Sequence, residues 1–333
     1  MGGGAVEIAL DVGGQEIKMC CREVAAASVL TRLTSIPSRS KGLFTKRSNN
    51  RQAMETLCAV LQEQMSTHSM ALNQVTKVAV AFAGPVDLDS GHILKAYNLG
   101  GKSHHGDLAG PLWDHLTGRY NAPRSLRVHV LNDALAPALA VLCAFEYTCI
   151  WPELSAALPY QAKLPALCLS LGTSVGVSVI AAPSTASEER GLITLPETWV
   201  CATLPTATGP TCLWEFLGSK ANSVDPEGIG MRIHAALPKF LELWDSEASL
   251  MEPAYTVIFT GGFAHALKHL DGSTWVNPQN PAQSIVLAVP ADTSALALHG
   301  AFNFRAAPMV CRVRRVAVIE GLEMSNSEVV VCA

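Results

Sequence analysis

The segment from Val128 to Ala140 joins a strand to a helix through two polar residues, and this junction limits the folds open to the chain. A β-branched apolar run ends at Asn132 and Asp133 and continues directly into a helix rich in Ala and Leu. In α/β sheets, ligands bind at the carboxyl ends of the strands. A carboxylate held there is placed to act as a general base. The alternative is that Asp133 only caps the helix, because Asn and Asp are favoured N-caps.

Three glycine-bearing turns accompany this junction. Each follows an apolar strand, and their central residues are Gly13 and Gly14, Gly172 and Thr173, and Gly261 and Gly262. The first two turns lead into a second strand, and the third leads into an Ala-rich segment that predicts a helix. Glycines permit positive φ angles and let backbone N–H groups approach an anion closely. Each turn alone is weak evidence, so the informative feature is their order along the chain.

This order resembles the actin/hexokinase/heat-shock-70 superfamily, and within it the ROK family of sugar kinases and related repressors. The stretches that carry the resemblance are 11–14, 78–87, 132–134, 171–176 and 259–262. The second stretch is similar to the family's Pro-Gly-Pro-Val-Asp turn, with Ala83 in place of the first proline. Matching segments run from Ile8 to Phe302, nearly the whole chain. The resemblance implies an α/β protein with the two-lobed actin-like ATPase (ribonuclease H-like) fold and an interdomain cleft.

The length of 333 residues exceeds the usual size of a single core, so we expect two domains. Residues 1–133 would form an N-terminal α/β lobe with the first phosphate turn and part of the sugar site. Residues 134–305 would form a C-terminal α/β lobe with the second phosphate turn and the adenosine turn. The tail, 306–333, includes an alternating apolar segment that predicts an added strand.

Composition excludes several other classes of protein. Apolar residues make up 49% and charged residues 16%, which is typical of a compact α/β protein. The net charge of -4 gives no reason to expect nucleic acid. The ten cysteines show no disulfide-framework spacing, which indicates a reducing compartment. The basic residues between Arg32 and Arg51 are interpreted as a solvated loop. We expect a cytoplasmic protein with no signal peptide and no membrane span, and leave a homodimer open.

The resemblance implies ATP-dependent phosphorylation of a hexose or N-acetylhexosamine hydroxyl, with Asp133 as the general base. Asn132 would hydrogen-bond a neighbouring hydroxyl, and the other sugar-site residues would be Gly84, Pro85 and Glu189. Asp11 would hold Mg²⁺ through water, since magnesium is usually bound by one or two carboxylates plus phosphates. The residues implied to bind ATP are Asp11, Gly13, Gly14, Gln15, Gly172, Thr173, Gly261 and Gly262.

Several positions depart from the family pattern. Gln15 stands where the family usually has Thr, Leu192 stands where its sugar and zinc motif has His, and Trp214 replaces a sugar-binding Glu. The zinc motif is reduced to Cys201 and Cys212, and two cysteines cannot close a tetrahedral site, so we expect no zinc. These departures favour an alternative function: a catalytically weak or silent relative that senses a sugar or nucleotide and acts on a protein partner.

Overall fold

The computed structural model describes residues 4–13, 16–24, 30–37, 50–67, 70–88, 90–94, 106–145, 162–181, 192–196, 198–218, 221, 225, 227–247, 254–293, 295–304, 311–316, 318–319, 322–323 and 328–331. The chain divides into two compact units. Unit 1 comprises Met1–Ala136 and Ala297–Phe304, and unit 2 comprises Pro137–Leu296 and Arg305–Ala333. The chain therefore enters unit 1 a second time, through one short helix near its C-terminal end.

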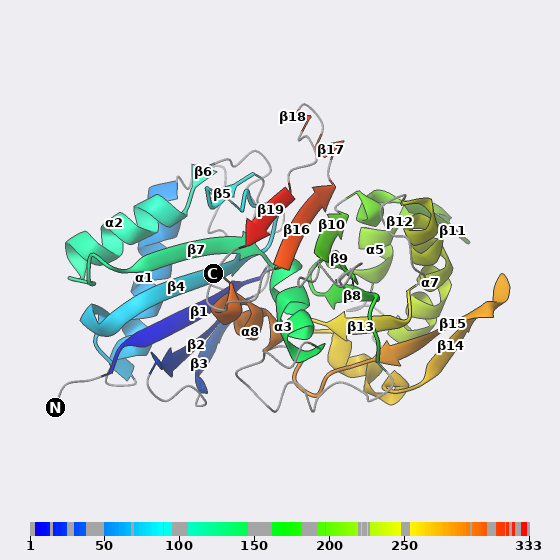
Figure 1. The fold of residues 1–333 in the computed structure, drawn as a ribbon, viewed down its shortest axis with the longest axis horizontal. Helices are drawn as coiled ribbons and strands as arrows, with labels where there is room; N and C mark the ends of the chain where they lie inside the picture. Colours follow the sequence, from blue (N-terminus) through cyan, green and yellow to red (C-terminus); the bar gives the residue numbers. More distant parts are fainter. Residues whose placement is uncertain are drawn as a thin grey trace. The chain divides into compact units, whose positions relative to one another are not determined.

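Unit 1 is built on a five-stranded sheet with the order β3-β2-β1-β4-β7 (Figure 1). These strands are β1 (Val6–Val12), β2 (Glu16–Glu23), β3 (Leu30–Pro37), β4 (Val75–Phe82) and β7 (Arg127–Asn132). The first three strands are antiparallel to one another, whereas β1, β4 and β7 run parallel. The remaining elements of unit 1 are α1 (Asn50–Thr67), η2 (Leu72–Gln74), α2 (Ala109–Arg119), nearly all of α8 (Leu296–Asn303) and a small hairpin of β5 (His92–Ile93) and β6 (Gly106–Asp107). Helix α3 (Leu135–Phe145) begins at the end of unit 1 and continues into unit 2.

Alternation along the strands gives the sheet of unit 1 two different faces, because successive side chains point to opposite sides. One face is apolar: Ile8 and Leu10 of β1 and Val78 and Val80 of β4 form one buried cluster with residues of α1 and α2. The residues between them carry small or charged side chains, such as Ala79, and this second face contacts α8. Helices α1 and α2 thus cover one face of the parallel strands, and α8 covers the other.

Unit 2 contains an eight-stranded sheet with the order β14-β15-β13-β8-β9-β10-β16-β19. Its strands are β8 (Ala166–Leu171), β9 (Val175–Ala181), β10 (Leu192–Pro196), β13 (Thr256–Thr260), β14 (Thr274–Asn277), β15 (Asn280–Ala288), β16 (Cys311–Val316) and β19 (Glu328–Val331). The tail therefore extends this sheet, because β16 pairs in parallel with β10 and β19 pairs with β16. The short strands β17 (Val318–Ile319) and β18 (Leu322–Glu323) pair with each other.

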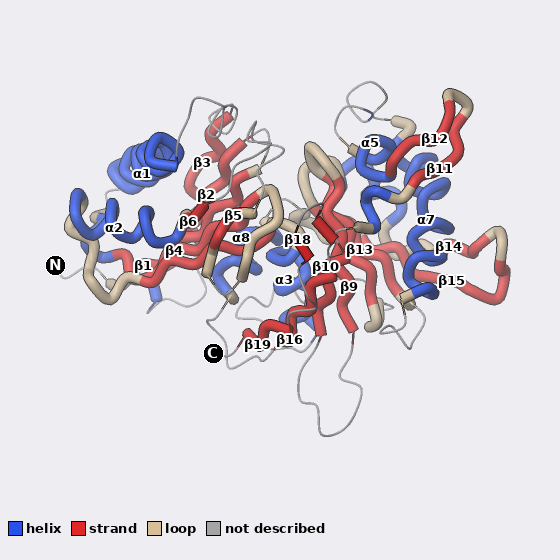
Figure 2. Tube along the Cα trace, turned by 90° about the horizontal axis from the view of Figure 1, so that it is seen from above, coloured by secondary structure: helices blue, strands red, loops and turns tan. Residues whose placement is uncertain are grey.

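Helices gather on one side of unit 2 with a second hairpin (Figure 2). They are η4 (Trp199–Cys201), α5 (Leu213–Leu217), α7 (Ile229–Ser246) and η5 (Ala264–Leu270), and the hairpin consists of β11 (Thr203–Thr206) and β12 (Gly209–Cys212). The apolar face of α7, including Phe240 and Trp244, packs into one buried cluster with Val257 of β13 and Leu287 of β15. This cluster is the core of unit 2.

The two units share one strand pattern. In unit 2, β10-β9-β8-β13-β15 repeats the order and the directions of β3-β2-β1-β4-β7 in unit 1. Two elements differ from the sequence-based expectations: Arg32 lies in a strand, β3, where a solvated loop was expected, and a 3₁₀ helix, η5, follows Gly261–Gly262. Within the described residues, no helix is long and apolar enough to cross a membrane.

Candidate functional site

The carboxyl ends of the three parallel strands in unit 1 are tied together by backbone hydrogen bonds. The N–H of Ala83, after β4, donates to the carbonyl of Val12 at 3.1 Å, and the N–H of Asp133, after β7, donates to the carbonyl of Phe82 at 3.0 Å. These bonds bring the residues that follow β1, β4 and β7 to one edge of the sheet. The predicted residues Asp11, Gly84 and Asp133 therefore belong to one local arrangement.

Asn132 organises this edge with its side-chain amide. Its Oδ1 accepts hydrogen bonds from the N–H groups of Ala134 at 2.7 Å and Leu135 at 3.3 Å, so it caps the start of α3. Its Nδ2 donates to the carbonyl of Gly84 at 2.7 Å. Gly84 has a φ of 153°, a conformation that glycine adopts without strain. The structure thus shows that Asn132 caps a helix and links two loops; its binding of a sugar stays a prediction.

Replacing Asn132 with Ala is expected to destabilise unit 1 by about 1–2 kcal/mol, because it removes a helix cap and the bond to Gly84. Urea unfolding of the full chain measures the change. An Ala substitution at the exposed Asn73 is the matched control and should be close to neutral. Equal stability of the Asn132 variant and the wild type would contradict the capping role.

Asp11 is a largely buried carboxylate near the end of β1. Burial raises the pKa of its carboxyl above the usual value, while the ammonium of Lys18, 3.6 Å away on β2, lowers it. The same ammonium lies 3.3 Å from Glu16. Burial disfavours the charged form of a carboxylate, and a nearby cation stabilises that form. Lys18 was not singled out in the sequence, although its pairing with Asp11 follows from the register of the hairpin.

Unit 2 brings the Gly172 turn and the Gly261 turn together at its own sheet edge. The N–H of Phe263 donates to the carbonyl of Leu171 at 3.1 Å. Gly261 has a φ of 87°, and a Cβ atom at this position would lie 2.6 Å from the same carbonyl oxygen. Only glycine satisfies both conditions, since other residues rarely adopt this φ and would also collide with the backbone. Two of the predicted turns are thus neighbours.

Two further residues shape this second edge. A Cβ atom on Gly218, directly after α5, would lie 3.1 Å from the carbonyl oxygen of Thr173 and 2.5 Å from that of Trp214, so the backbone passes close to the turn. His265 places its Nδ1 2.5 Å from the carbonyl oxygen of Gly262. Neither residue is recognisable from the sequence, because no local pattern marks a glycine after a five-residue helix.

Some predicted site residues lie outside the described part of the chain, namely Gly14, Gln15 and Glu189. Among the departures from the family pattern, Trp214 is exposed on α5 and Leu192 begins β10. Cys201 is exposed and Cys212 partly buried, and both are free thiols. Within the described residues, no group of three or more His, Cys, Asp and Glu side chains is placed to hold a metal.

Comparison with solved structures identifies the fold. The chain is similar to inorganic polyphosphate/ATP-glucomannokinase from Arthrobacter sp. strain KM, with a TM-score of 0.55, 17% identity and coverage of 90% of this chain and 97% of that chain. It is also similar to glucokinase from Balamuthia mandrillaris in complex with glucose, with a TM-score of 0.54, 14% identity and coverage of 90% of this chain and 93% of that chain. A third similar structure is a ROK family protein from Streptococcus pneumoniae TIGR4 in complex with sucrose, with a TM-score of 0.50, 15% identity and coverage of 89% of this chain and 96% of that chain.

No family model matches the sequence, and no curated protein matches it. At these low identities, what the chain shares with the solved structures is the fold. Over about nine-tenths of its length, the chain has the α/β fold of the two sugar kinases and of the ROK family protein named above. The expected fold class and the resemblance to the ROK family are confirmed at this level.

Proposed function

We propose that the protein is an ATP-dependent kinase that phosphorylates a hydroxyl of a hexose or N-acetylhexosamine. The observation that carries the proposal is the edge of unit 1, where Asp11 and Asp133 lie at the carboxyl ends of parallel strands and Asp133 is fixed by the bond to Phe82. Ligands of open α/β sheets bind at such edges. Support comes from the names of the structural neighbours, which include a glucokinase and an ATP-glucomannokinase.

Asp133 has the role of general base in this proposal. Phosphoryl transfer needs aligned reactants, neutralised phosphate charge and an acceptor for the proton of the attacking hydroxyl. A carboxylate that accepts this proton contributes roughly 10²–10⁴-fold to the rate. Gly84, Pro85 and Glu189 are the other proposed sugar-site residues. Asn132 is also a proposed sugar-site residue, and its amide holds the loop of Gly84 against the start of α3.

Asp11 is the proposed holder of Mg²⁺, through water. Its buried carboxylate fits a cation, because burial raises its pKa and a positive neighbour favours its charged form. When bound, Mg²⁺ would supply positive charge to the phosphates of ATP. The phosphates and adenosine are assigned to Gly13, Gly14, Gln15, Gly172, Thr173, Gly261 and Gly262.

A coupled assay of ADP release tests the proposed activity. The full chain is mixed with ATP and Mg²⁺ and then with glucose, mannose, N-acetylglucosamine or N-acetylmannosamine. We expect at least one sugar to raise ADP release well above the sugar-free rate, and chelation of Mg²⁺ to abolish the increase. The proposal fails if no sugar raises ADP release while an active hexokinase in the same buffer does.

The second candidate function is a sugar or nucleotide sensor with little or no turnover. Two observations favour it: the amide of Asn132 is used for capping, and an exposed Trp214 stands where the family has a sugar-binding Glu. A sensor would be thermally stabilised by one sugar without releasing ADP, because a ligand that prefers the native state raises its apparent stability. Thermal unfolding with the same four sugars therefore separates the two candidates.

A further inference from the structure

A row of four charged residues crosses the sheet of unit 1 beneath α8. In strand register, Arg22 of β2 pairs with Glu7 of β1, Glu7 pairs with Lys77 of β4, and Lys77 pairs with Arg127 of β7. Arg22 and Glu7 are each 7% exposed and Lys77 is 1% exposed. The row therefore contains three cationic side chains and one carboxylate, and two of these cations are buried.

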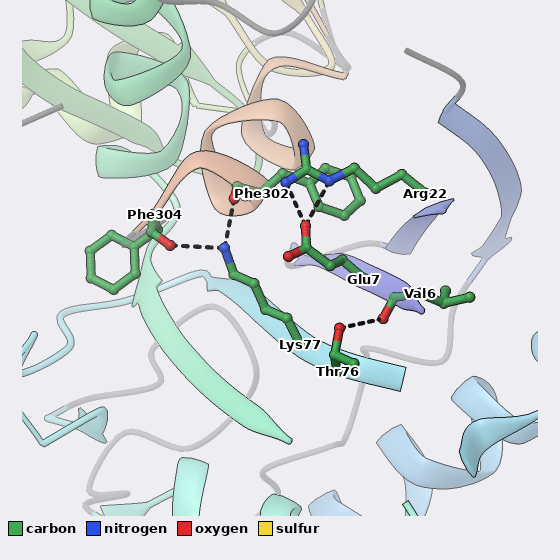
Figure 3. Close-up of polar contacts among 7 residues, drawn as sticks. All are labelled: Val6, Glu7, Arg22, Thr76, Lys77, Phe302 and Phe304. Atoms are coloured by element: carbon green, nitrogen blue, oxygen red, sulfur yellow. Dashed lines mark hydrogen bonds and ion pairs between the residues drawn. The ribbon is translucent and has the colours of Figure 1, made fainter. Parts of the chain in front are cut away.

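That carboxylate is already engaged by arginine. The Nε of Arg22 donates to Oε2 of Glu7 at 2.7 Å, and Nη2 contacts the same oxygen. The guanidinium also lies 4.9 Å from the ring centroid of Phe302 on α8. Figure 3 shows that Glu7 faces Arg22, whereas the side chain of Lys77 points to the end of α8. Glu7 thus forms its ion pair with Arg22.

Among the residues that the structure describes, Lys77 donates to neutral acceptors. Its Nζ donates to the carbonyl of Phe302 at 2.6 Å and to that of Phe304 at 2.8 Å (Figure 3). These carbonyls belong to the C-terminal end of α8, where the helix dipole favours a cation. A buried ammonium without a hydrogen-bonded carboxylate is nevertheless costly, because burial disfavours the charged form.

The surrounding charges add to this cost. Burial is the main cause that lowers the pKa of Lys77, to about 7, with further lowering from Arg22 and Arg127 and an opposing effect of Glu7. Two histidines belong to the elements around it: His129 of β7, whose ring centroid lies 5.8 Å from that of Phe304, and His299 of α8. The contact between α8 and the sheet thus encloses a lysine whose protonated form is disfavoured.

The position of α8 is coupled to the turn that carries Asp133. A Cβ atom on Gly300 would lie 1.6 Å from the carbonyl oxygen of Ala136, so the two backbones are in direct contact. Ala136 lies in the first turn of α3, directly after the amides capped by Asn132. A displacement of α8 therefore changes the support of the loop that contains Asp133.

We propose that Lys77 is a proton-sensitive anchor of α8, whose protonation loosens α8 from the sheet and with it the turn that positions Asp133. Lys77 is a positioning residue, and only the last step rests on the proposed function. The direction of the pH effect follows from the linkage between protonation of Lys77 and docking of α8. When α8 lifts, Lys77 meets water and regains its ordinary affinity for a proton, whereas the docked form prefers the neutral amine. Opening is therefore favoured as pH falls from about 10.5 towards about 7.

Hydrogen exchange of the full chain without ligand tests this anchor between pH 7.0 and 9.0. After correction for the intrinsic exchange rates, the amides of α8 are expected to become about 50-fold better protected as pH rises across this range. The amides of Ala134 and Leu135 should follow the same trend. Burial raises the pKa of Cys21 to about 11 and that of Cys58 to about 12, so these thiols stay protonated in the folded protein throughout.

Two variants complete the experiment. Lys77→Met removes the titrating group and should abolish the pH dependence of α8 protection, whereas Lys163→Met, at an exposed lysine of unit 2, should leave it unchanged. If Lys77→Met does not fold, an NMR titration of the Lys77 side chain in the wild type decides, with an ordinary lysine pKa overturning the proposal. Protection of α8 that is independent of pH overturns it too, as does a response of α8 that Ala134 and Leu135 do not share. None of these readouts uses turnover, so they are independent of the kinase assay.

Discussion

Replacing Asp133 with Asn is expected to abolish sugar-dependent ATP turnover while leaving the fold of unit 1 intact. The amide keeps the shape of the carboxylate and can still hydrogen-bond, but it cannot accept the proton of the attacking hydroxyl. Loss of an essential base should reduce kcat by at least about 10²-fold with a smaller change in KM. Steady-state kinetics with the best sugar from the ADP-release assay measures both constants.

The matched control for this variant is Asp114→Asn, at an exposed position of α2 in the same unit. It should retain wild-type kcat. Circular dichroism and sugar binding by both variants establish that the fold and the sugar site are intact. Wild-type turnover by the Asp133 variant would show that this carboxylate is not the base and that the proposed mechanism is wrong.

Replacing Gly261 with Ala is expected to destabilise unit 2 by about 2–4 kcal/mol. Two costs combine: the residue must hold a φ of 87°, and its Cβ would lie 2.6 Å from the carbonyl oxygen of Leu171, which is backbone and cannot rotate away. Relief of the collision would move the Gly172 turn. Urea unfolding followed by tryptophan fluorescence measures the loss of stability.

The adjacent glycine provides the control. A Cβ on Gly262 would meet nothing within 4 Å, so Gly262→Ala should change the free energy of unfolding by less than about 1 kcal/mol. A similar loss in both variants would mean that the turn is sensitive as a whole and not through the contact with Leu171. No loss in either variant would show that the close approach described here is absent in solution.

The positions of several strands and helices along the chain were predictable from the sequence, because their local pattern is strong. The apolar run before Asp133 lies in β7 and the Ala- and Leu-rich stretch after it forms α3. The apolar strands expected before the three glycine-bearing turns are β1, β8 and β13. These segments have apolar runs of the length and period of their element, bounded by polar residues or glycine. The turns that follow the strands were found for the same reason.

Other features depend on contacts between distant residues and leave no local signal. Arg32 lies in β3 because β2 offers an open edge for pairing, whereas the surrounding basic residues indicate a loop. Lys77 looks like the polar first residue of an apolar strand. Its burial under Phe302 and Phe304 involves residues more than 220 positions away. The sequence suggested capping as the alternative role of Asp133, whereas the structure shows a cap made by Asn132.

The repeated strand order has a consequence for the electrostatic character of the two sheet edges. Gly84 follows β4 and Gly261 follows β13, so these two positive-φ glycines hold equivalent places in the two units. Around Gly84 the edge carries the acids Asp11 and Asp133, whereas the turns 170–173 and 260–262 of unit 2 contain hydroxyls and glycines but no acid. The segment after β15 also reaches the edge of unit 2, because the N–H of Gly261 donates to the carbonyl of Thr293 at 3.2 Å, and it carries the single acid Asp292, whose Oδ1 accepts from the N–H of Ala295. The acids of unit 1 thus lie at the ends of β1 and β7, whereas the acid of unit 2 follows β15. With two acids close to its glycine turn, the edge of unit 1 attracts cations more strongly than the edge of unit 2.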